Sequence, residues 1–350
     1  LPEGGLRRLV CQRLGLSEDN DFGLLSAIGG DCAGALSLRP PGVTEVDADY
    51  RPLDPKELAK AAGGGASVLA MFTGLKGLRL SLAGAQDKLP VRIDGEKLLL
   101  PVGSAASTHI LKFGNRDFAH LPANEAFMAL LAAELGLEVA PIELRRIGRE
   151  PVAVVTRYDR TVEGSKVSRL HQEDLCQALG RDPRRKYEKE GGPSVPDCVS
   201  VIAAHSANPL VDIRAVLEWQ VFNVIAGNCD GHGKNLSLLY GATGLRLSPR
   251  YDLVCTRAYQ SLDRDLAMSV AGLFDPTNVL RRHWEACAVA AGVRPALVIE
   301  TVERMATSMP DASAAAAKRF RAQWGDSPVL RQVLQVARKQ ARRCLNQLER

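Results

Sequence analysis

The sequence has no apolar run long enough to cross a membrane and no close pair of cysteines. A membrane helix needs roughly 18 to 20 consecutive apolar residues, and no stretch reaches that length although 46% of the chain is hydrophobic. The eight cysteines are scattered and no secretory apolar segment opens the chain, which argues against a disulfide framework or a structural zinc site. We therefore expect a soluble globular protein in the reducing cytoplasm, without membrane contact.

The chain has little excess of either charge, because its net charge is +5 and acidic and basic residues are interspersed over most of its length. The C-terminal region is the exception. It holds the basic residues Lys318, Arg319, Arg321, Arg331, Arg338, Lys339, Arg342, Arg343 and Arg350 against Asp326 and Glu349. Since Val329, Val333 and Val336 recur near helical spacing, an amphipathic terminal helix with a solvated basic face is predicted. A surface for nucleic acid or for a partner protein is the alternative.

At 350 residues the chain can bury two lobes. Its first part predicts helices at 5–14, 54–62 and 122–135 and strands at 34–38, 79–82, 88–93, 97–102, 108–113, 141–147 and 152–158. After Asp159 the pattern is mainly helical, with helices expected at 172–179, 195–205, 213–225, 283–291 and 295–307 and a hairpin at 236–240 and 245–247. This order predicts an α+β, bilobal protein-kinase-like fold with a strand-rich N-terminal lobe (1–158) and a mainly helical C-terminal lobe (159–350).

The densest polar cluster is the loop Gly227–Asn235, which follows a helix that carries Trp219 and Phe222. A helix this apolar must be buried, so the loop that leaves it lies at the edge of a core, where catalytic loops are found. Asp230 and Asn235 are separated by the Asp-x-x-x-x-Asn spacing with which protein kinases place a carboxylate on the substrate hydroxyl and an amide on magnesium. An Asx-rich turn with purely local hydrogen bonds is the alternative.

Asp252 strengthens the kinase interpretation because it follows Asn235 after one predicted hairpin, where a kinase places its second metal-binding aspartate. Magnesium prefers oxygen ligands and keeps several waters, so one carboxylate, one amide and phosphate oxygens are sufficient to hold it. The alternative is that Asp252 caps a turn after Pro249.

The stretch Ser81–Lys88 lies between two predicted strands and consists largely of small residues, so its amides could approach phosphate oxygens. It matches neither a Walker loop nor the Gly-x-Gly-x-x-Gly loop of common kinases, and a tight hairpin is the alternative. Lys112 would place an ammonium group on a strand behind this loop, as a phosphate-binding lysine requires. A lone lysine at a strand end is usually a surface residue.

The motifs taken together resemble the HipA family of bacterial toxin kinases. They are Ser81–Lys88, Ile110–Phe113, Asn124–Ala126, Thr156–Arg160, Leu170–Gly180, Gly227–Asn235 and Tyr251–Leu253, and the stretch Asp31–Leu36 extends the likeness towards the first residue. The resemblance implies an atypical ATP- and Mg²⁺-dependent serine/threonine kinase that is the toxin of a toxin–antitoxin pair. Its partners would be a DNA-binding HipB-type antitoxin, operator DNA bound through that complex, and an aminoacyl-tRNA synthetase as the target whose phosphorylation arrests growth.

The resemblance also implies roles for individual residues. ATP would be bound by Ala83, Gly84, Ala85, Gln86, Asp87, Lys88, Lys112, Thr156, Arg157, Tyr158, His232, Asn235, Tyr251 and Asp252. Asp230 would be the catalytic base, with Lys112 and Lys234 assisting at the phosphates, and Asn235 and Asp252 would hold the metal. Lys234 as a solvated lysine is the alternative. Ser81 would be the site of an inactivating autophosphorylation.

The sequence departs from the family pattern in two places. Thr156 stands in the hinge where an acidic residue is usual, which puts one adenine or ribose contact in doubt. The family also has further β-rich sequence before Leu1, so we expect that an upstream portion is missing. Glu125 and Glu134 are both candidates for the ion pair with Lys112, and the stretch 181–190 is a candidate docking loop for the target.

Two other functions remain as alternatives. Asp230-Gly231-His232 has the look of a metal site of a metal-dependent hydrolase, but such a site needs further ligands, and the other histidines are dispersed. The second alternative is a catalytically idle, HipA-like corepressor that binds an antitoxin and, through the basic C-terminal region, DNA. Steep loss of binding with salt would support that role.

Overall fold

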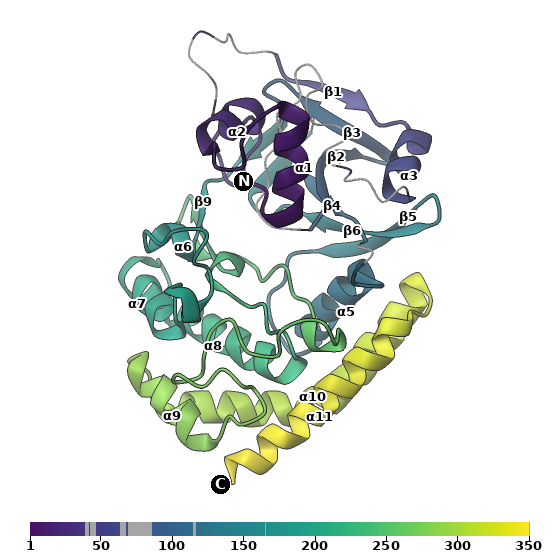
Figure 1. Cartoon of the computed structure of the whole chain (residues 1–350). Helices are drawn as coiled ribbons and strands as arrows, with labels where there is room; N and C mark the ends of the chain where they lie inside the picture. Colours follow the sequence, from purple (N-terminus) through teal and green to yellow (C-terminus); the bar gives the residue numbers. More distant parts are fainter. Residues whose placement is uncertain are drawn as a thin grey trace. The chain divides into compact units, whose positions relative to one another are not determined.

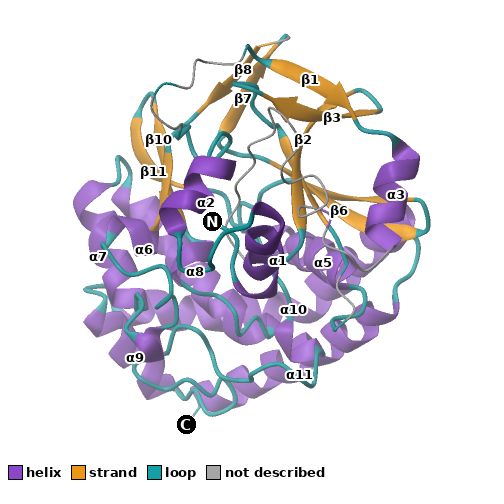
Figure 2. Ribbon diagram, turned by 45° about the horizontal axis from the view of Figure 1, so that its top comes forward, coloured by secondary structure: helices purple, strands orange, loops and turns teal. Residues whose placement is uncertain are grey.

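The computed structural model describes residues 1–38, 42, 47–63, 68, 86–114, 117–164 and 166–349, and these residues form two compact units (Figure 1). Unit 1 comprises Leu1–Pro122 and Pro141–Gln172, and unit 2 comprises Ala123–Ala140 and Glu173–Arg350. Unit 1 is built around a sheet, whereas unit 2 is mainly helical (Figure 2). This combination of a sheet-containing unit and a mainly helical unit agrees with the predicted α+β fold.

In the described part of unit 1, an antiparallel sheet has the strand order β1-β3-β2-β4-β6-β5. Its strands are β1 (Asp49–Pro52), β2 (Lys88–Asp94), β3 (Lys97–Val102), β4 (His109–Lys112), β5 (Ile142–Ile147) and β6 (Glu150–Thr156). The predicted hairpins form where glycine adopts a left-handed conformation, at Gly95 and at Gly148. The predicted strand 79–82 lies outside the described residues.

Helices pack on this sheet to form the core of unit 1. They are α1 (Gly4–Leu14), α2 (Asp21–Ile28) and α3 (Pro55–Gly63). Val10 and Leu24 lie in one buried cluster with the strand residues Leu89, Leu111 and Val154. Burial of such apolar side chains contributes about 1.5–3 kcal/mol each, so the cluster holds these helices against the sheet.

One sequence prediction in unit 1 is wrong, and two elements were missed. The strand expected at 34–38 is a turn, because Gly34 has φ +71° and its N–H donates to the Asp159 carboxylate at 2.8 Å instead of to a sheet. The hairpin of β7 (Arg160–Glu163) and β8 (Lys166–Arg169), which precedes the helical region, was not predicted. Helix α2 was not predicted, although the Asn20 side chain caps it by accepting from the Gly23 N–H.

Unit 2 contains most of the helices of the described chain. They are α5 (Leu121–Glu134, which begins in unit 1), α6 (Leu175–Ala178), α7 (Val195–His205), α8 (Pro209–Ala226), α9 (Arg281–Ala290), α10 (Pro295–Trp324) and α11 (Pro328–Leu348), with the 3₁₀ turns η1 (Glu188–Glu190), η2 (Gly233–Asn235) and η3 (Thr256–Ala258). A small sheet joins β9 (Gln172–Asp174), β10 (Ser237–Gly241) and β11 (Gly244–Leu247).

The predicted helix at 172–179 is wrong in its first half, which is strand β9. Asp174 then starts α6 through a capping box with Gln177, so the polar residues that suggested a helix interior form its cap. The helix predicted at 295–307 continues to Trp324 as α10, because the alanine-rich stretch 312–317 favours helix strongly enough to tolerate Pro310.

Helix α5 groups with unit 2 although the sequence placed it in the N-terminal lobe. Phe127 packs edge-on against Phe320 of α10, with ring centroids 6.0 Å apart. The Asn124 amide accepts from the Cys255 N–H and donates to the Cys255 carbonyl. Unit 1 ends at Gln172, whereas the predicted N-terminal lobe ended at residue 158. The difference is the segment that contains the β7–β8 hairpin, which belongs to unit 1.

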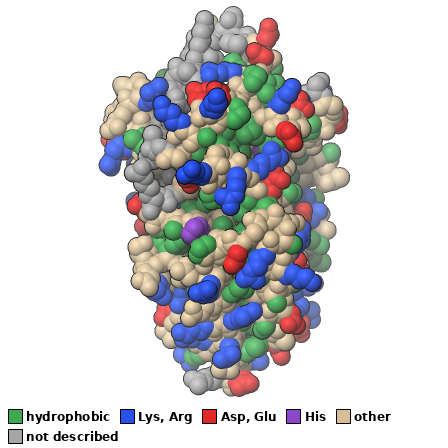
Figure 3. Space-filling view, turned by 90° about the vertical axis from the view of Figure 1, so that its right-hand side faces the viewer, with side chains coloured by type: hydrophobic (Ala, Val, Ile, Leu, Met, Phe, Trp, Pro, Cys, Tyr) green, Lys and Arg blue, Asp and Glu red, His purple; other side chains and the backbone are tan. Residues whose placement is uncertain are grey.

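The C-terminal helix α11 is amphipathic, as predicted. Val329, Val333 and Cys344 are buried, while Arg331, Arg338, Lys339 and Arg342 are exposed. Figure 3 shows lysine and arginine side chains over the whole of this face, including its lower half, which is the side on which α10 and α11 lie in Figure 1. Within the described ranges, every helix is too short or too polar to cross a membrane.

Candidate active site

The loop Gly227–Asn235 leaves a helix that is buried almost throughout. Trp219, Phe222 and Ile225 of α8 are fully covered, and the helix ends at Gly227, whose left-handed conformation (φ +77°) lets its N–H donate to the Asn223 carbonyl. The chain therefore turns sharply at the edge of the core of unit 2. The predicted position of the loop, between a buried helix and strand β10, is observed.

Asp230 is the exposed member of this loop, with 52% of its side chain accessible. Its backbone N–H donates to Asn228 Oδ1 at 3.2 Å, and Asn228 Nδ2 donates in turn to Asn223 Oδ1 at 3.0 Å. One carboxylate oxygen, Oδ1, accepts from the Tyr187 hydroxyl at 2.7 Å and lies 3.9 Å from His232 Nε2. The Asp230 carboxylate is therefore accessible to solvent as a hydrogen-bond acceptor, while the backbone of Asp230 is fixed by Asn228.

Burial lowers the pKa of His232 to about 4, even though the neighbouring Asp230 opposes the shift. The imidazole is therefore neutral near pH 7 and adds no charge beside Asp230. The backbone N–H of His232 donates to Asn235 Oδ1 at 3.0 Å, which fixes the amide of Asn235 within the loop.

Asn235 and Asp252, the predicted metal ligands, lie together. Asn235 Nδ2 donates to Asp252 Oδ2 at 3.3 Å, across seventeen positions of the sequence. Asp252 adopts the left-handed conformation with φ +58°, which is unusual for a residue other than glycine and typical of functional sites. The Asn235 amide oxygen, which here accepts from the His232 N–H, and the Asp252 carboxylate are oxygen donors of the kind that Mg²⁺ prefers, so the residue types present fit this ion.

Tyr251 supports the same loop from the other side of the hairpin. Its hydroxyl donates to the Lys234 carbonyl at 2.7 Å and lies 2.7 Å from the Ser237 hydroxyl. These bonds fix the backbone between Lys234 and β10. Contacts of Tyr251 and Lys234 with ATP remain predictions.

Two glycines allow this loop to pack closely. A Cβ atom at Gly231 would lie 2.4 Å from Asn223 Nδ2 and 3.2 Å from a ring carbon of Trp219, and one at Gly233 would lie 2.7 Å from Pro193. All of these neighbours belong to buried or tightly packed residues, so the loop cannot accommodate a side chain at either position without moving.

Since Asp230 is the predicted catalytic base, replacing Gly231 with alanine should lower phosphate transfer about 100-fold, because a displacement of the Asp230 carboxylate by about 1 Å would disturb its alignment. The same substitution should destabilise unit 2 by about 1–3 kcal/mol. The matched control is Gly241→Ala in β10, where the nearest atom to the new methyl group would lie 3.6 Å away and no change is expected. Initial rates and thermal melting of both variants measure the difference. Equal activity of the two variants would show that the loop tolerates the displacement.

The predicted phosphate-binding residues belong to unit 1, and Ser81, Ala83, Gly84 and Ala85 fall outside the described residues. The segment that follows them is held to the end of β4. Gln86 Nε2 donates to the Phe113 carbonyl at 3.1 Å, and the Phe113 N–H donates to the Asp87 carbonyl at 3.0 Å.

Lys88 and Lys112 are register partners on β2 and β4. Opposite residues of an antiparallel pair share one face of the sheet, so both ammonium groups lie on the same side. Both side chains are buried, and a buried ammonium is stable only beside compensating acceptors. Such a pair suits the binding of a polyanion. This position of Lys112 is compatible with its predicted role as a phosphate ligand. Lys88, which was also predicted to bind ATP, lies opposite Lys112 on the same face of the sheet.

The predicted hinge, Thr156–Tyr158, follows β6. The Thr156 N–H donates to the Pro141 carbonyl and the Arg157 N–H to the Thr108 carbonyl, each at 2.9 Å. The Tyr158 hydroxyl donates to Gln172 Oε1. The Arg157 side chain is buried in an ion cluster, so a contact between Arg157 and adenine would fall to its backbone.

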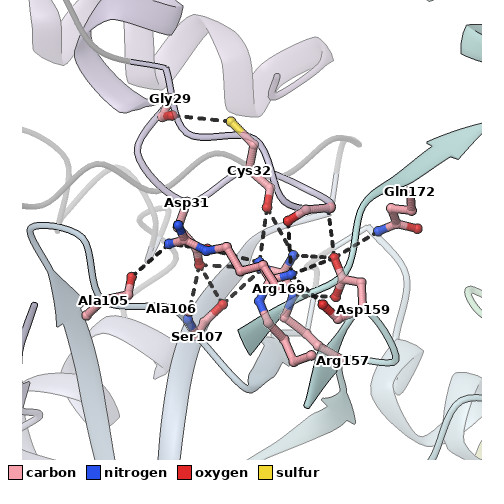
Figure 4. Close-up of polar contacts among 12 residues, drawn as sticks. Gly29, Asp31, Cys32, Ala105, Ala106, Ser107, Arg157, Asp159, Arg169 and Gln172 are labelled. Carbon is pink, nitrogen blue, oxygen red and sulfur yellow. Dashed lines mark hydrogen bonds and ion pairs between the residues drawn. The ribbon is translucent and has the colours of Figure 1, made fainter. Parts of the chain in front are cut away.

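This ion cluster, which we call the Asp31 cluster, was not predicted (Figure 4). Its members are Asp31, Ser107, Arg157, Asp159, Arg160 and Arg169. Asp31 accepts from the Ser107 hydroxyl at 2.6 Å and pairs with Arg160 at 3.0 Å, and Asp159 pairs with Arg157 at 2.8 Å. Asp159 lies beside its partners Arg157 and Arg160 in the sequence, but Asp31 is more than 120 positions from the arginines it pairs with, and nothing in the sequence linked them.

The charges of the cluster are strongly coupled. Burial alone would raise the pKa of Asp31 and of Asp159, but the guanidinium groups of Arg157 and Arg160 outweigh it, so both pKa values are lowered. Both carboxylates are therefore ionised at neutral pH and hold the turn at residue 34 and the end of β6 together.

The two glutamates proposed as partners of Lys112 differ in environment. Glu134 is 30% exposed and lies 3.8 Å from Arg319, whereas Glu125 is 2% exposed. An ion pair of Lys112 with either glutamate stays a prediction. Across the described ranges, no group of three or more His, Cys, Asp or Glu side chains could hold a metal ion.

Comparisons with known proteins agree on one family. A family model described as the HipA-like C-terminal domain matches residues 80–313, and a model described as the HipA N-terminal domain matches residues 1–39. The chain is 42% identical to the Sinorhizobium fredii protein Y4mE over 327 residues, which covers 91% of this chain and 76% of that protein. It is 34% identical to the serine/threonine-protein kinase toxin HipA of Shewanella oneidensis, with 90% and 75% covered.

A solved structure is similar as well. The Shewanella oneidensis structure of the toxin–antitoxin system HipA, HipB and its operator DNA matches with a TM-score of 0.85 and 30% identity, over 99% of this chain and 84% of that one. The matched family region contains both the loop Gly227–Asn235 and Asp252.

Proposed function

The chain belongs to the HipA family of protein serine/threonine kinases, with that family's kinase-like α+β fold, and we propose that it transfers the γ-phosphoryl group of ATP to a protein serine or threonine. The observation that carries this proposal is the loop of unit 2, where Asp230 is exposed and Asn235 and Asp252 lie within hydrogen-bond distance of each other. These three residues would supply the one base and two metal ligands that phosphoryl transfer requires.

In this mechanism Asp230 orients the acceptor hydroxyl and accepts its proton as the phosphoryl group is transferred. Asn235 and Asp252 would hold magnesium, which when bound neutralises charge on the phosphates. Lys88 and Lys112 of unit 1 bind the phosphates, and the Thr156–Tyr158 segment binds adenine. Unit 1 and unit 2 would then correspond to the two lobes of a kinase.

The same family membership supports a proposal for the biological role. We propose a cytoplasmic, growth-arresting toxin that is held by a HipB-type antitoxin, binds operator DNA in that complex and phosphorylates an aminoacyl-tRNA synthetase. The similar Shewanella protein was solved in a complex with HipB and its operator DNA, which supports an antitoxin and DNA as partners here. The exposed basic face of α11 supports a nucleic-acid contact and also supports the alternative of a catalytically idle corepressor.

Autophosphorylation at Ser81 gives a direct test. A phosphate there adds about −1.5 to −2 charges to a segment proposed to bind ATP phosphates, so it should switch the kinase off. Unphosphorylated protein incubated with labelled ATP and Mg²⁺ should label itself and a protein in added cell extract.

The Ser81→Ala variant should lose the label on itself and keep transfer to the extract, whereas the control Ser308→Ala, an exposed serine of α10, should behave like the wild type. Complete absence of label would leave the idle corepressor as the function. Salt-sensitive binding of the antitoxin complex to DNA would then be measured.

A further inference from the structure

Tyr187 contacts the proposed catalytic base directly. Its hydroxyl lies 2.7 Å from Asp230 Oδ1, and because an ionised carboxylate can only accept, the tyrosine is the donor. The ring packs edge-on against His232, with the ring centroids 5.5 Å apart and the planes at 76°. The tyrosine is separated from Asp230 by 43 positions of the sequence and lies in the stretch 181–190 that was predicted as a docking loop.

The backbone around Tyr187 is fixed by the segment 265–269. The Glu188 N–H donates to the Ala267 carbonyl at 3.0 Å, and the Glu188 carboxylate accepts from both the N–H and the hydroxyl of Ser269. Lys189 forms an ion pair with Asp265. These bonds fix the backbone that carries Tyr187 beside the loop of Asp230.

The same segment also binds the loop that carries Asp230. The Ala267 N–H donates to the Cys229 carbonyl at 2.9 Å, while the Ala267 carbonyl accepts from Glu188. Ala267 thus joins the residue before Asp230 to the residue after Tyr187. The two backbone hydrogen bonds of Ala267 therefore hold the segment of Tyr187 and the loop of Asp230 next to each other. The contact between the hydroxyl and the carboxylate is supported by the backbone on both sides.

We propose that Tyr187 is a positioning residue for the kinase reaction. This inference rests on the proposed function of Asp230 as base. The Asp230 side chain is 52% exposed and can rotate about its last bond. The hydrogen bond from Tyr187 to Oδ1 would restrict this rotation and leave Oδ2 to accept from the substrate hydroxyl. Alignment of this kind lowers the barrier of the chemical step without changing the binding of ATP.

The test removes only the hydroxyl. Tyr187→Phe keeps the ring against His232, and the maximal rate of label transfer from ATP should fall about 10- to 100-fold, the effect of losing a hydrogen bond to a charged group, with KM for ATP within about twofold of wild type. The matched control is Tyr240→Phe, because the Tyr240 hydroxyl also donates to a carboxylate, that of Glu173, away from the loop. This variant should retain full activity.

A spectroscopic measurement tests the contact without activity. With ¹³Cζ-labelled tyrosine, the resonance that disappears in Tyr187→Phe should shift in Asp230→Asn, because the donor then faces a neutral amide. A Tyr187→Phe variant as active as wild type, while Asp230→Asn is inactive, overturns the positioning role alone. Higher activity overturns it too, since the hydroxyl would then be blocking the acceptor site. An inactive wild type overturns the proposed function and this inference together.

Discussion

Asp230→Asn should lower the rate of phosphate transfer by about 10²- to 10⁴-fold, which is the contribution of a positioned general base. The asparagine has the same shape as aspartate but cannot take the proton from the acceptor hydroxyl. Because the Asp230 side chain is half-exposed, the substitution should leave the melting temperature of the protein nearly unchanged. Initial rates with labelled ATP, Mg²⁺ and cell extract, together with a thermal melt, measure both effects.

The matched control is Asp311→Asn on α10, which removes an equally charged, exposed carboxylate outside the loop. It should retain wild-type activity, so that a loss in Asp230→Asn cannot be assigned to net charge. If Asp230→Asn keeps a rate within about threefold of wild type, the magnitude is too small for a general base. The proton would then have another acceptor, and the assignment of Asp230 would be wrong.

Asp31→Asn should destabilise unit 1 by about 3–5 kcal/mol, the cost of removing one partner from a buried ion pair. Arg157 and Arg160 would each lose a charged partner within a site that is almost closed to water. Thermal melting and hydrogen exchange of the β4 and β6 amides measure the loss. The control Asp19→Asn removes an exposed carboxylate from the same unit and should change its stability by less than about 0.5 kcal/mol.

The same cluster should make unit 1 sensitive to acid. The folded-state pKa of Asp31 is lowered below its ordinary value of 3.8, so its contribution to stability is present above that value and is lost as the pH falls through the lowered pKa. Wild-type protein should therefore lose protection of β4 and β6 below about pH 4, and Asp31→Asn should show a weaker dependence on pH in that range. Parallel curves for the two proteins would mean that Asp31 does not stabilise unit 1 through its charge.

The parts of the site that the sequence predicted are those fixed by near neighbours. Helix α8 was expected from its apolar residues, and hairpin β10–β11 from the glycines at its turn. Asp230, Asn235 and Asp252 were found because their spacing places them on one loop and just after one hairpin. Local dihedral preferences and apolar periodicity act over a few residues, so they can be read directly from the sequence.

Contacts between distant segments could not be predicted in this way. The partner of Asp230 is 43 positions away, and Arg157 and Asp31 are 126 positions apart. The wrong strand at 34–38 has the same origin, since the Gly34 N–H is satisfied by Asp159 and not by a neighbouring strand.

The sequence by itself thus determined the family, the kinase-like fold and the candidate base and metal ligands. Tertiary structure alone decided that Arg157 belongs to a buried ion cluster, that Glu125 and not Glu134 is buried, and that Tyr187 holds Asp230. The physical reason is that a long-range hydrogen bond or ion pair forms only when packing brings two distant chain segments together. The local sequence around each residue does not indicate which distant residue will be its partner.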